Sequence, residues 1–106
     1  MNLRGRPKNY RIVKIDPIIS QFSPRGRPGR PDEVSLSVDE YEAIRLSDCL
    51  GLNQKNAAVS MRISQQTFSR ILRHAHKLVA DAITAGKIIK IQGGSYVISS
   101  KENKSL

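Results

Sequence analysis

Apolar residues recur every three or four positions between residues 54 and 86, which is the spacing of one face of an α-helix. The pattern divides into two helices. The first follows Asn53 and ends near Ser60, and the second follows Ser64 and continues to Gly86 as one long helix of about six turns. The apolar stripe of the second helix consists of Phe68, Ile71, Leu72, Ala75, Leu78, Val79, Ala82 and Ile83.

The residues where these two helices meet have the sizes that a helix-turn-helix needs. Ala57 and Ala58 are small enough for the helices to approach closely, and Met61 and Ile63 flank the turn. Ser64 can cap the N-terminus of the second helix with its hydroxyl. In a DNA-binding helix-turn-helix the second helix enters the major groove, so the spacing predicts this function.

One position departs from the usual pattern of that turn. Arg62 stands where glycine is common, because a positive φ costs glycine nothing. We expect either a modest conformational cost at Arg62 or a slightly different turn.

A further helix is predicted before this pair. Ser37 and Glu40 have the spacing of a capping box, and Leu36 and Tyr41 have that of a hydrophobic staple. Gly51 is expected to end this helix. Its expected buried residues are Tyr41, Ile44 and either Val38 or Cys49.

Strands are predicted at both ends of the chain. Residues 10–15 alternate between polar and apolar side chains, which indicates a short strand. Residues 87–92 and 95–99 flank Gly93 and Gly94, which is the signal of a β-hairpin with a two-residue turn. The polar tail from Ser100 is expected to be disordered.

These elements predict a single, mainly α domain, because 106 residues support one modest core and no deep catalytic cleft. We expect a basic arm with a short strand at 1–31, a helix-turn-helix domain at 32–86, a β-hairpin at 87–99 and the tail at 100–106.

Charge favours a nucleic-acid partner. The net charge is +9, no acidic residue lies between positions 49 and 80, and six of the nine acids lie between 32 and 48. The alternative is an ordinary helical hairpin whose apolar stripe only builds a core, but such a hairpin would mix charges of both signs. The expected DNA-binding residues are Lys55, Ser64, Gln65, Gln66, Thr67, Ser69, Arg70, Arg73 and Lys77, together with Arg4 and Arg6 of the arm. Glutamine suits the edge of adenine and arginine that of guanine.

The arm repeats one tetrapeptide, Arg-Gly-Arg-Pro, at residues 4–7 and 25–28. The tetrapeptide is similar to the core of an AT-hook, whose arginines lie in a narrow minor groove. For the first copy, recognition of the minor groove and simple contact with phosphates remain equal alternatives. For the second copy, a structural loop is favoured.

Other functions lack their signals. No apolar run is long enough for a membrane span, and no secretory signal is present, so we expect a cytoplasmic protein. No catalytic constellation or cofactor motif is visible, and an enzyme is not expected. His74 and His76 would point to different faces of a helix, which argues against a shared metal and for solvated or phosphate-contacting roles. Cys49 is expected to be a buried apolar group.

The string VSLSVDEYEAIRLSDCLGLNQKNAAVSMRISQQTFSRILRHAHKLVADAITAGKIIKIQGG resembles the bacterial and archaeal family called domain of unknown function 134, or uncharacterised protein family 0251. The resemblance extends from the RPK sequence near the start to KIIKIQGG. It implies a DNA-binding helix-turn-helix fold similar to region 4 of sigma factors, and it implies no known target or effector.

The sequence is compatible with three functions. We expect a transcriptional regulator that binds double-stranded DNA through the helix beginning at Ser64. The alternatives are an architectural, nucleoid-type protein and a module that docks on the transcription machinery; RNA binding is less favoured, because the five aromatic residues form no stacking platform. The long apolar stripe exceeds what two short helices can cover, so part of it is expected to pack on the N-terminal strand, the final hairpin or a second subunit. We also expect a homodimer.

Overall fold

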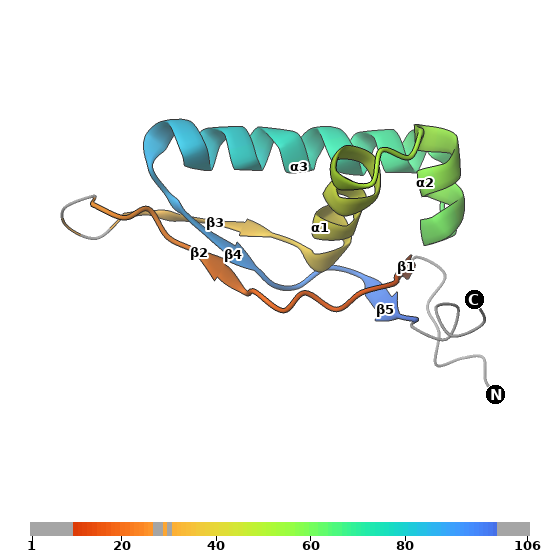
Figure 1. The fold of residues 1–106 in the computed structure, drawn as a ribbon, viewed down its shortest axis with the longest axis horizontal. Coiled ribbons are helices and arrows are strands. Elements are labelled where there is room, and N and C mark those ends of the chain that lie inside the picture. Colours follow the sequence, from red (N-terminus) through yellow and green to blue (C-terminus); the bar gives the residue numbers. More distant parts are fainter. Residues whose placement is uncertain (1–9, 27–28, 30, 100–106) are drawn as a thin grey trace.

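The computed structural model describes residues 10–26, 29 and 31–99. Its strands are β1 (Arg11–Val13), β2 (Gln21–Phe22), β3 (Glu33–Leu36), β4 (Ile88–Ile91) and β5 (Tyr96–Ile98). Its helices are α1 (Val38–Ile44), which continues into the π-helical η1 (Arg45–Cys49), then α2 (Gln54–Met61) and α3 (Gln65–Ala85). Figure 1 shows α3 as a long rod above a layer of strands, with α1 and α2 crossing its N-terminal half.

The predicted helix boundaries are confirmed by their caps. Ser37 and Glu40 form the complete capping box of α1, and the side chains of Asn53 and Ser64 cap α2 and α3. At the other end of α3, Gly86 adopts a left-handed conformation with φ of 68°. The long second helix predicted from the apolar stripe is therefore present as one element.

A core of helices alone fills the end of the molecule that contains α2. It joins the end of α1 and η1 with α2 and the first half of α3. Small residues permit this close packing, since Ala57 and Ala58 are buried beside Met61 and Phe68, as expected from the sequence. Its buried members are Ala43, Leu46, Ala57, Ala58, Met61, Phe68 and Leu72.

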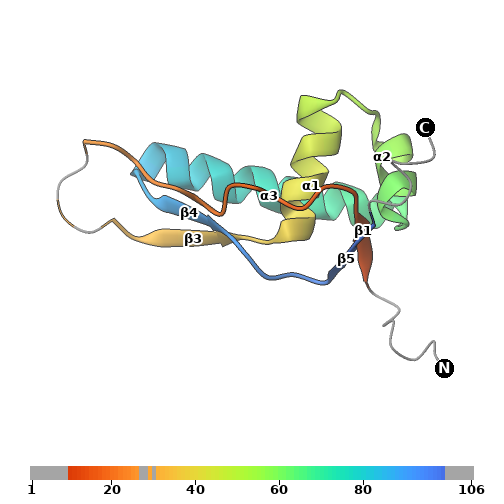
Figure 2. The ribbon, with the colours of Figure 1, turned by 60° about the horizontal axis from the view of Figure 1, so that its bottom comes forward.

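A three-stranded sheet in the order β2-β4-β3 lies under the second half of α3 (Figures 1 and 2). Strand β4 pairs antiparallel with β2 and parallel with β3. Leu78 and Val79 pack against the core cluster that contains Leu36 and Ile91. Of the packing partners expected for this half of α3, the chain itself therefore supplies most of the cover through β3 and β4, while Ile83 remains 72% exposed.

The predicted C-terminal hairpin is wrong. Strands β4 and β5 belong to different sheets, and β5 pairs in parallel with β1. Gly93 and Gly94 both have positive φ, but they carry the chain across the start of α1 instead of reversing it. The carbonyl of Gly93 accepts a hydrogen bond from the N–H of Val38, and a Cβ at Gly94 would collide with Asp39. Close approach to α1 thus explains the two glycines.

The end of the first helix also differs from expectation. In η1 the N–H of Leu50 bonds to the carbonyl of Arg45, five residues earlier, which widens the turn. Leu46 faces the core, whereas Cys49 is exposed, so the prediction of a buried Cys49 is wrong. Val38 is buried as expected, and Tyr41 is half-buried.

Candidate nucleic-acid interface

The turn between α2 and α3 is built around Arg62. This residue has φ of 58° and ψ of 47°, a left-handed conformation that glycine adopts without strain. The N–H of Arg62 donates a hydrogen bond to the carbonyl of Val59, and the N–H of Ile63 donates one to the carbonyl of Ala58. The first of the two expectations for Arg62 is confirmed: the usual turn is kept, at a conformational cost of about 1 kcal/mol.

The first turn of α3 is closed by Ser64 and Thr67. The hydroxyl oxygen of Ser64 accepts the N–H of Thr67 at 3.0 Å, and its hydroxyl donates to Thr67 Oγ1 at 2.9 Å. These two side chains, predicted to contact DNA, are therefore engaged with each other. The backbone N–H groups of this helix start can still bind a phosphate, because helix N-termini present unpaired donors.

Five predicted residues share one side of α3, opposite the core. Their steps of one, three and four positions bring their side chains to one surface. Ser69 is half-buried and the other four are exposed. We call this surface the α3 polar face, and it consists of Gln66, Ser69, Arg70, Arg73 and Lys77.

An open hollow of about 390 Å³ lies between the starts of α2 and α3, and it is lined by Gln54, Gln65, Gln66 and Ser69. It extends the α3 polar face onto α2, where Lys55 is also exposed. Sequence reasoning missed Gln54. The signal was present, since Gln54 is the first residue of α2 and carries the same amide as its neighbours on α3. Amide side chains offer a donor and an acceptor together, as the edge of adenine requires.

The two histidines of α3 are exposed to solvent, as expected, but each also contacts a carboxylate. His74 Nδ1 bonds to Glu40 Oε2 at the start of α1, and His76 Nε2 lies 2.6 Å from Asp48 Oδ2 in η1. Both pairs tie α3 to the helix that it crosses, and they flank the α3 polar face. Within the described ranges, no three histidine, cysteine, aspartate or glutamate residues gather as a metal site would require.

A buried acid fixes the position of α1 below this interface. Glu42 is fully buried and accepts hydrogen bonds from Nε and Nη2 of Arg45, at 2.8 and 2.9 Å, and from the N–H of Lys14 at 3.1 Å. Hydrogen bonding to Glu42 raises the pKa of Arg45. Asp39 is also buried and pairs with Arg11 of β1 at 3.2 Å. Sequence analysis did not single out either acid, because the contacts that bury them come from the distant strand β1 and from Lys14 after it.

Arg4 and Arg6, the predicted arm residues, lie outside the described residues. In the second copy of the tetrapeptide, Arg25 and Gly26 form an exposed turn after β2, and positions 27 and 28 lie outside the described residues.

Comparison with known proteins identifies the family. The model of the family described as "Protein of unknown function DUF134" matches residues 1–99. The chain belongs to this family. Its DUF134 relatives include a UPF0251 protein of Prosthecochloris aestuarii, 49% identical over 104 residues that cover 97% of the chain and 66% of the relative. A UPF0251 protein of Caldicellulosiruptor bescii is 50% identical over 90% of the chain and 66% of the relative.

The chain therefore spans about two thirds of the length of these two relatives. A shorter UPF0251 protein, from Thermoanaerobacter sp., is 43% identical over 93% of the chain and 88% of its own length. No solved structure matches the chain. No helix in the described part of the chain is long and apolar enough to cross a membrane.

Proposed function

We propose that this chain binds double-stranded DNA and regulates transcription, with α3 lying in the major groove. The observation that carries the proposal is the α3 polar face. It presents Arg70, Arg73 and Lys77 to solvent beside exposed Gln66, on a helix whose opposite side is packed into the core. No acidic residue lies between positions 49 and 80 to oppose a phosphate backbone.

Each residue type on this surface has its own role in the proposal. Gln66 and Arg70 read base edges, because glutamine and arginine offer the bidentate hydrogen bonds that adenine and guanine accept. Lys55 on α2 contacts a phosphate and so supplies affinity without sequence information. The steep crossing of α2 over α3 seen in Figure 1 suits a first helix that lies across the backbone.

The proposal describes a cytoplasmic binding protein without catalytic activity. It includes a homodimer, since two copies of α3 could read two half-sites. Within the described residues, exposed apolar groups such as Ile83 support the dimer. An architectural role and docking on the transcription machinery are the alternatives, and the similarity to sigma region 4 belongs to the same proposal.

Selection from a library of random DNA duplexes, performed at a stated salt concentration, tests the function. A regulator enriches one motif over successive rounds. An architectural protein retains duplexes of all sequences without enrichment, and a docking module retains none. Either of these last two outcomes contradicts direct reading by α3.

A further inference from the structure

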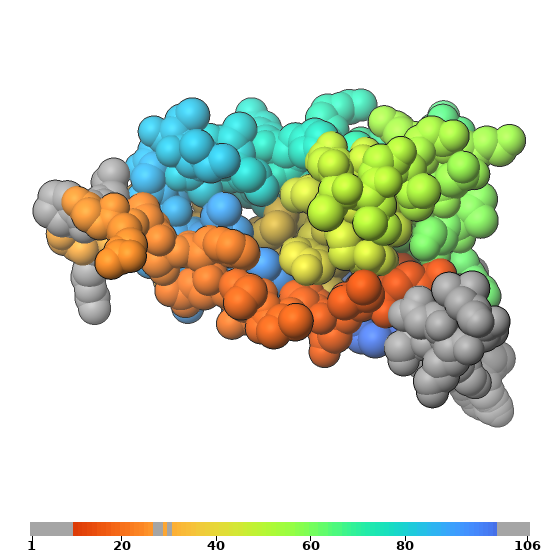
Figure 3. Space-filling view, viewed as in Figure 1, coloured from red at the N-terminus to blue at the C-terminus, as the bar shows by residue number. Residues whose placement is uncertain are grey.

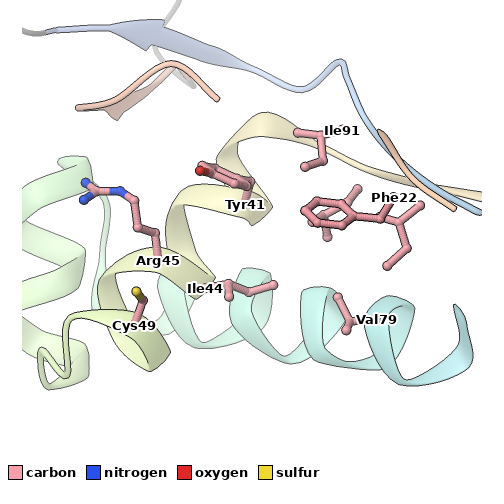
Figure 4. Close-up of a pocket in the computed structure, with 9 residues that line it drawn as sticks. Phe22, Tyr41, Ile44, Arg45, Cys49, Val79 and Ile91 are labelled. Atoms are coloured by element: carbon pink, nitrogen blue, oxygen red, sulfur yellow. The ribbon is translucent and has the colours of Figure 1, made fainter. Parts of the chain in front are cut away.

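An apolar pocket of about 340 Å³ lies on the other side of α3, away from the polar face. In Figure 3 it is visible as a hollow between the α3, α1 and β2 segments. Figure 4 shows Phe22 and Ile91 from the strands on one side and Ile44 and Val79 from the helices on the other. Its apolar walls are formed by Phe22, Tyr41, Ile44, Val79, Ile89 and Ile91.

The pocket offers little to a charged ligand. Arg45 is the charged residue of its lining, and the guanidinium already donates two hydrogen bonds to the buried Glu42. The charge of Arg45 is thus matched within the chain. A carboxylate entering the pocket would lose its hydration without gaining an unmatched cation, which is costly.

The size and surface of the pocket favour a small aromatic molecule. Water inside such an apolar space finds few hydrogen-bond partners, and an apolar cavity of roughly 150 Å³ is enough to bind benzene. A pocket a little more than twice that size accommodates two fused rings. Because α1, η1, α3 and the three strands β2, β3 and β4 surround it, the pocket is concave in the way of small-molecule sites.

The segment η1 provides an independent indication. It contributes Arg45 and Cys49 to one wall, and single π-helical turns occur often at functional sites. At the entrance, Phe22 lies on the edge strand β2 and is 54% exposed, so its ring is available to cover a ligand. We propose that this pocket binds a small, uncharged, two-ring aromatic molecule between α1, η1, α3 and the sheet.

Titration of the full chain with indole tests the proposal, with methyl NMR of Ile44, Ile89 and Ile91 as the readout. We expect one saturable site with Kd in the range of about 0.1 to 1 mM, as nine non-hydrogen atoms permit. Indole-3-carboxylate, which adds a charge to the same rings, should bind at least about tenfold more weakly. The readout needs no DNA, so its failure and that of the proposed function are distinguishable.

Two variants locate the site. Cys49→Trp places a large side chain at an exposed position of the wall and should abolish the saturable shifts. Val59→Trp, at a residue of α2 that is 68% exposed and outside the pocket, should leave them unchanged. Phe22→Ala, which removes the exposed ring without filling space, should weaken binding several-fold.

Four results would overturn the proposal. The first is the absence of saturable shifts up to about 5 mM indole, and the second is an equal loss of indole binding in Cys49→Trp and Val59→Trp. The third is tighter binding of indole-3-carboxylate than of indole, and the fourth is loss of bound indole as the protein concentration rises and the protein doubles its mass. The last result would mean that a second copy of the chain fills the pocket.

Discussion

Gly94 lies so close to Asp39 that the loop between β4 and β5 is locked onto the start of α1. A Cβ on Gly94 would overlap Oδ1 of Asp39 and would lie 2.9 Å from the Cβ of Ser37. Oδ1 of Asp39 is buried, with no hydrogen-bond partner among the described residues, while Oδ2 pairs with Arg11. Asp39 of α1 is therefore in contact with both Arg11 of β1 and the loop that leads to β5.

Gly94→Ala should lower the free energy of unfolding more than Gly93→Ala, measured by urea denaturation. Both glycines have positive φ, so both substitutions incur backbone strain of about 1 kcal/mol. Only Gly94 has neighbours that a Cβ would meet, which should add about 1 to 3 kcal/mol. Equal losses for the two variants would show that the contact with Asp39 contributes nothing.

Arg62→Gly should raise the free energy of unfolding by about 0.5 to 1 kcal/mol, because it relieves the left-handed conformation of the turn. Arg73→Gly is the matched control. It makes the same exchange at an exposed position inside α3 and should lower stability by about 1 kcal/mol. Thermal or urea denaturation gives both signs, and a loss of stability in Arg62→Gly would contradict this account of the turn.

Glu42→Gln should lower the free energy of unfolding by about 3 kcal/mol, because it leaves the Arg45 guanidinium without its buried counter-charge. Glu33→Gln removes a carboxylate from a pair with Lys90 that is 3.8 Å long and largely exposed. That loss should stay below about 0.5 kcal/mol. Denaturation curves that place the two variants at the same stability would refute the structural role of Glu42.

Local signals in the sequence predicted the helices, while pairings between distant segments escaped prediction. Capping by Ser37, Asn53 and Ser64, and the positive φ of Arg62, depend on residues a few positions apart. The parallel pairing of β1 with β5 joins the two ends of the fold and has no local signature. Gly93 and Gly94 illustrate the difference, because a hairpin turn and a close crossing require the same residue type.

The candidate site divides in the same way. Helical spacing alone gathered the α3 polar face, since its members lie on one helix. The hydrogen bonds of His74 and His76 to acids of α1 and η1 depend on how two helices cross, which spacing along one helix does not determine. The pocket between α1, α3 and the sheet likewise depends on strands β2 and β3, which sequence reasoning did not predict.

Sedimentation at micromolar concentration should give the mass of a dimer if the proposed assembly is correct. Ile83→Asp should then produce a folded monomer, because this residue is the exposed end of the apolar stripe on α3. Val59→Asp changes a similarly exposed residue of α2 and should leave the dimer intact. A parent chain that sediments as a folded monomer would remove the dimer from the proposal.

The central claim is that the α3 polar face reads base pairs. The decisive quantity is the ratio of affinities for a selected duplex and a random duplex, obtained by fluorescence anisotropy over a range of salt concentrations. Lys55→Ala is the control for phosphate contact. It should weaken binding to both duplexes alike, and it should reduce the slope of log affinity against log salt concentration by about one unit.

Gln66→Ala and Arg70→Ala should lower that ratio. Each should weaken binding to the selected duplex by about 1 to 3 kcal/mol more than binding to the random duplex. Arg25→Ala removes the same type of side chain as Arg70→Ala, from the exposed turn after β2, and should leave the ratio unchanged. A selective loss confined to the variants of α3 is the predicted result. Equal weakening of both duplexes by Gln66→Ala and Arg70→Ala would contradict the claim.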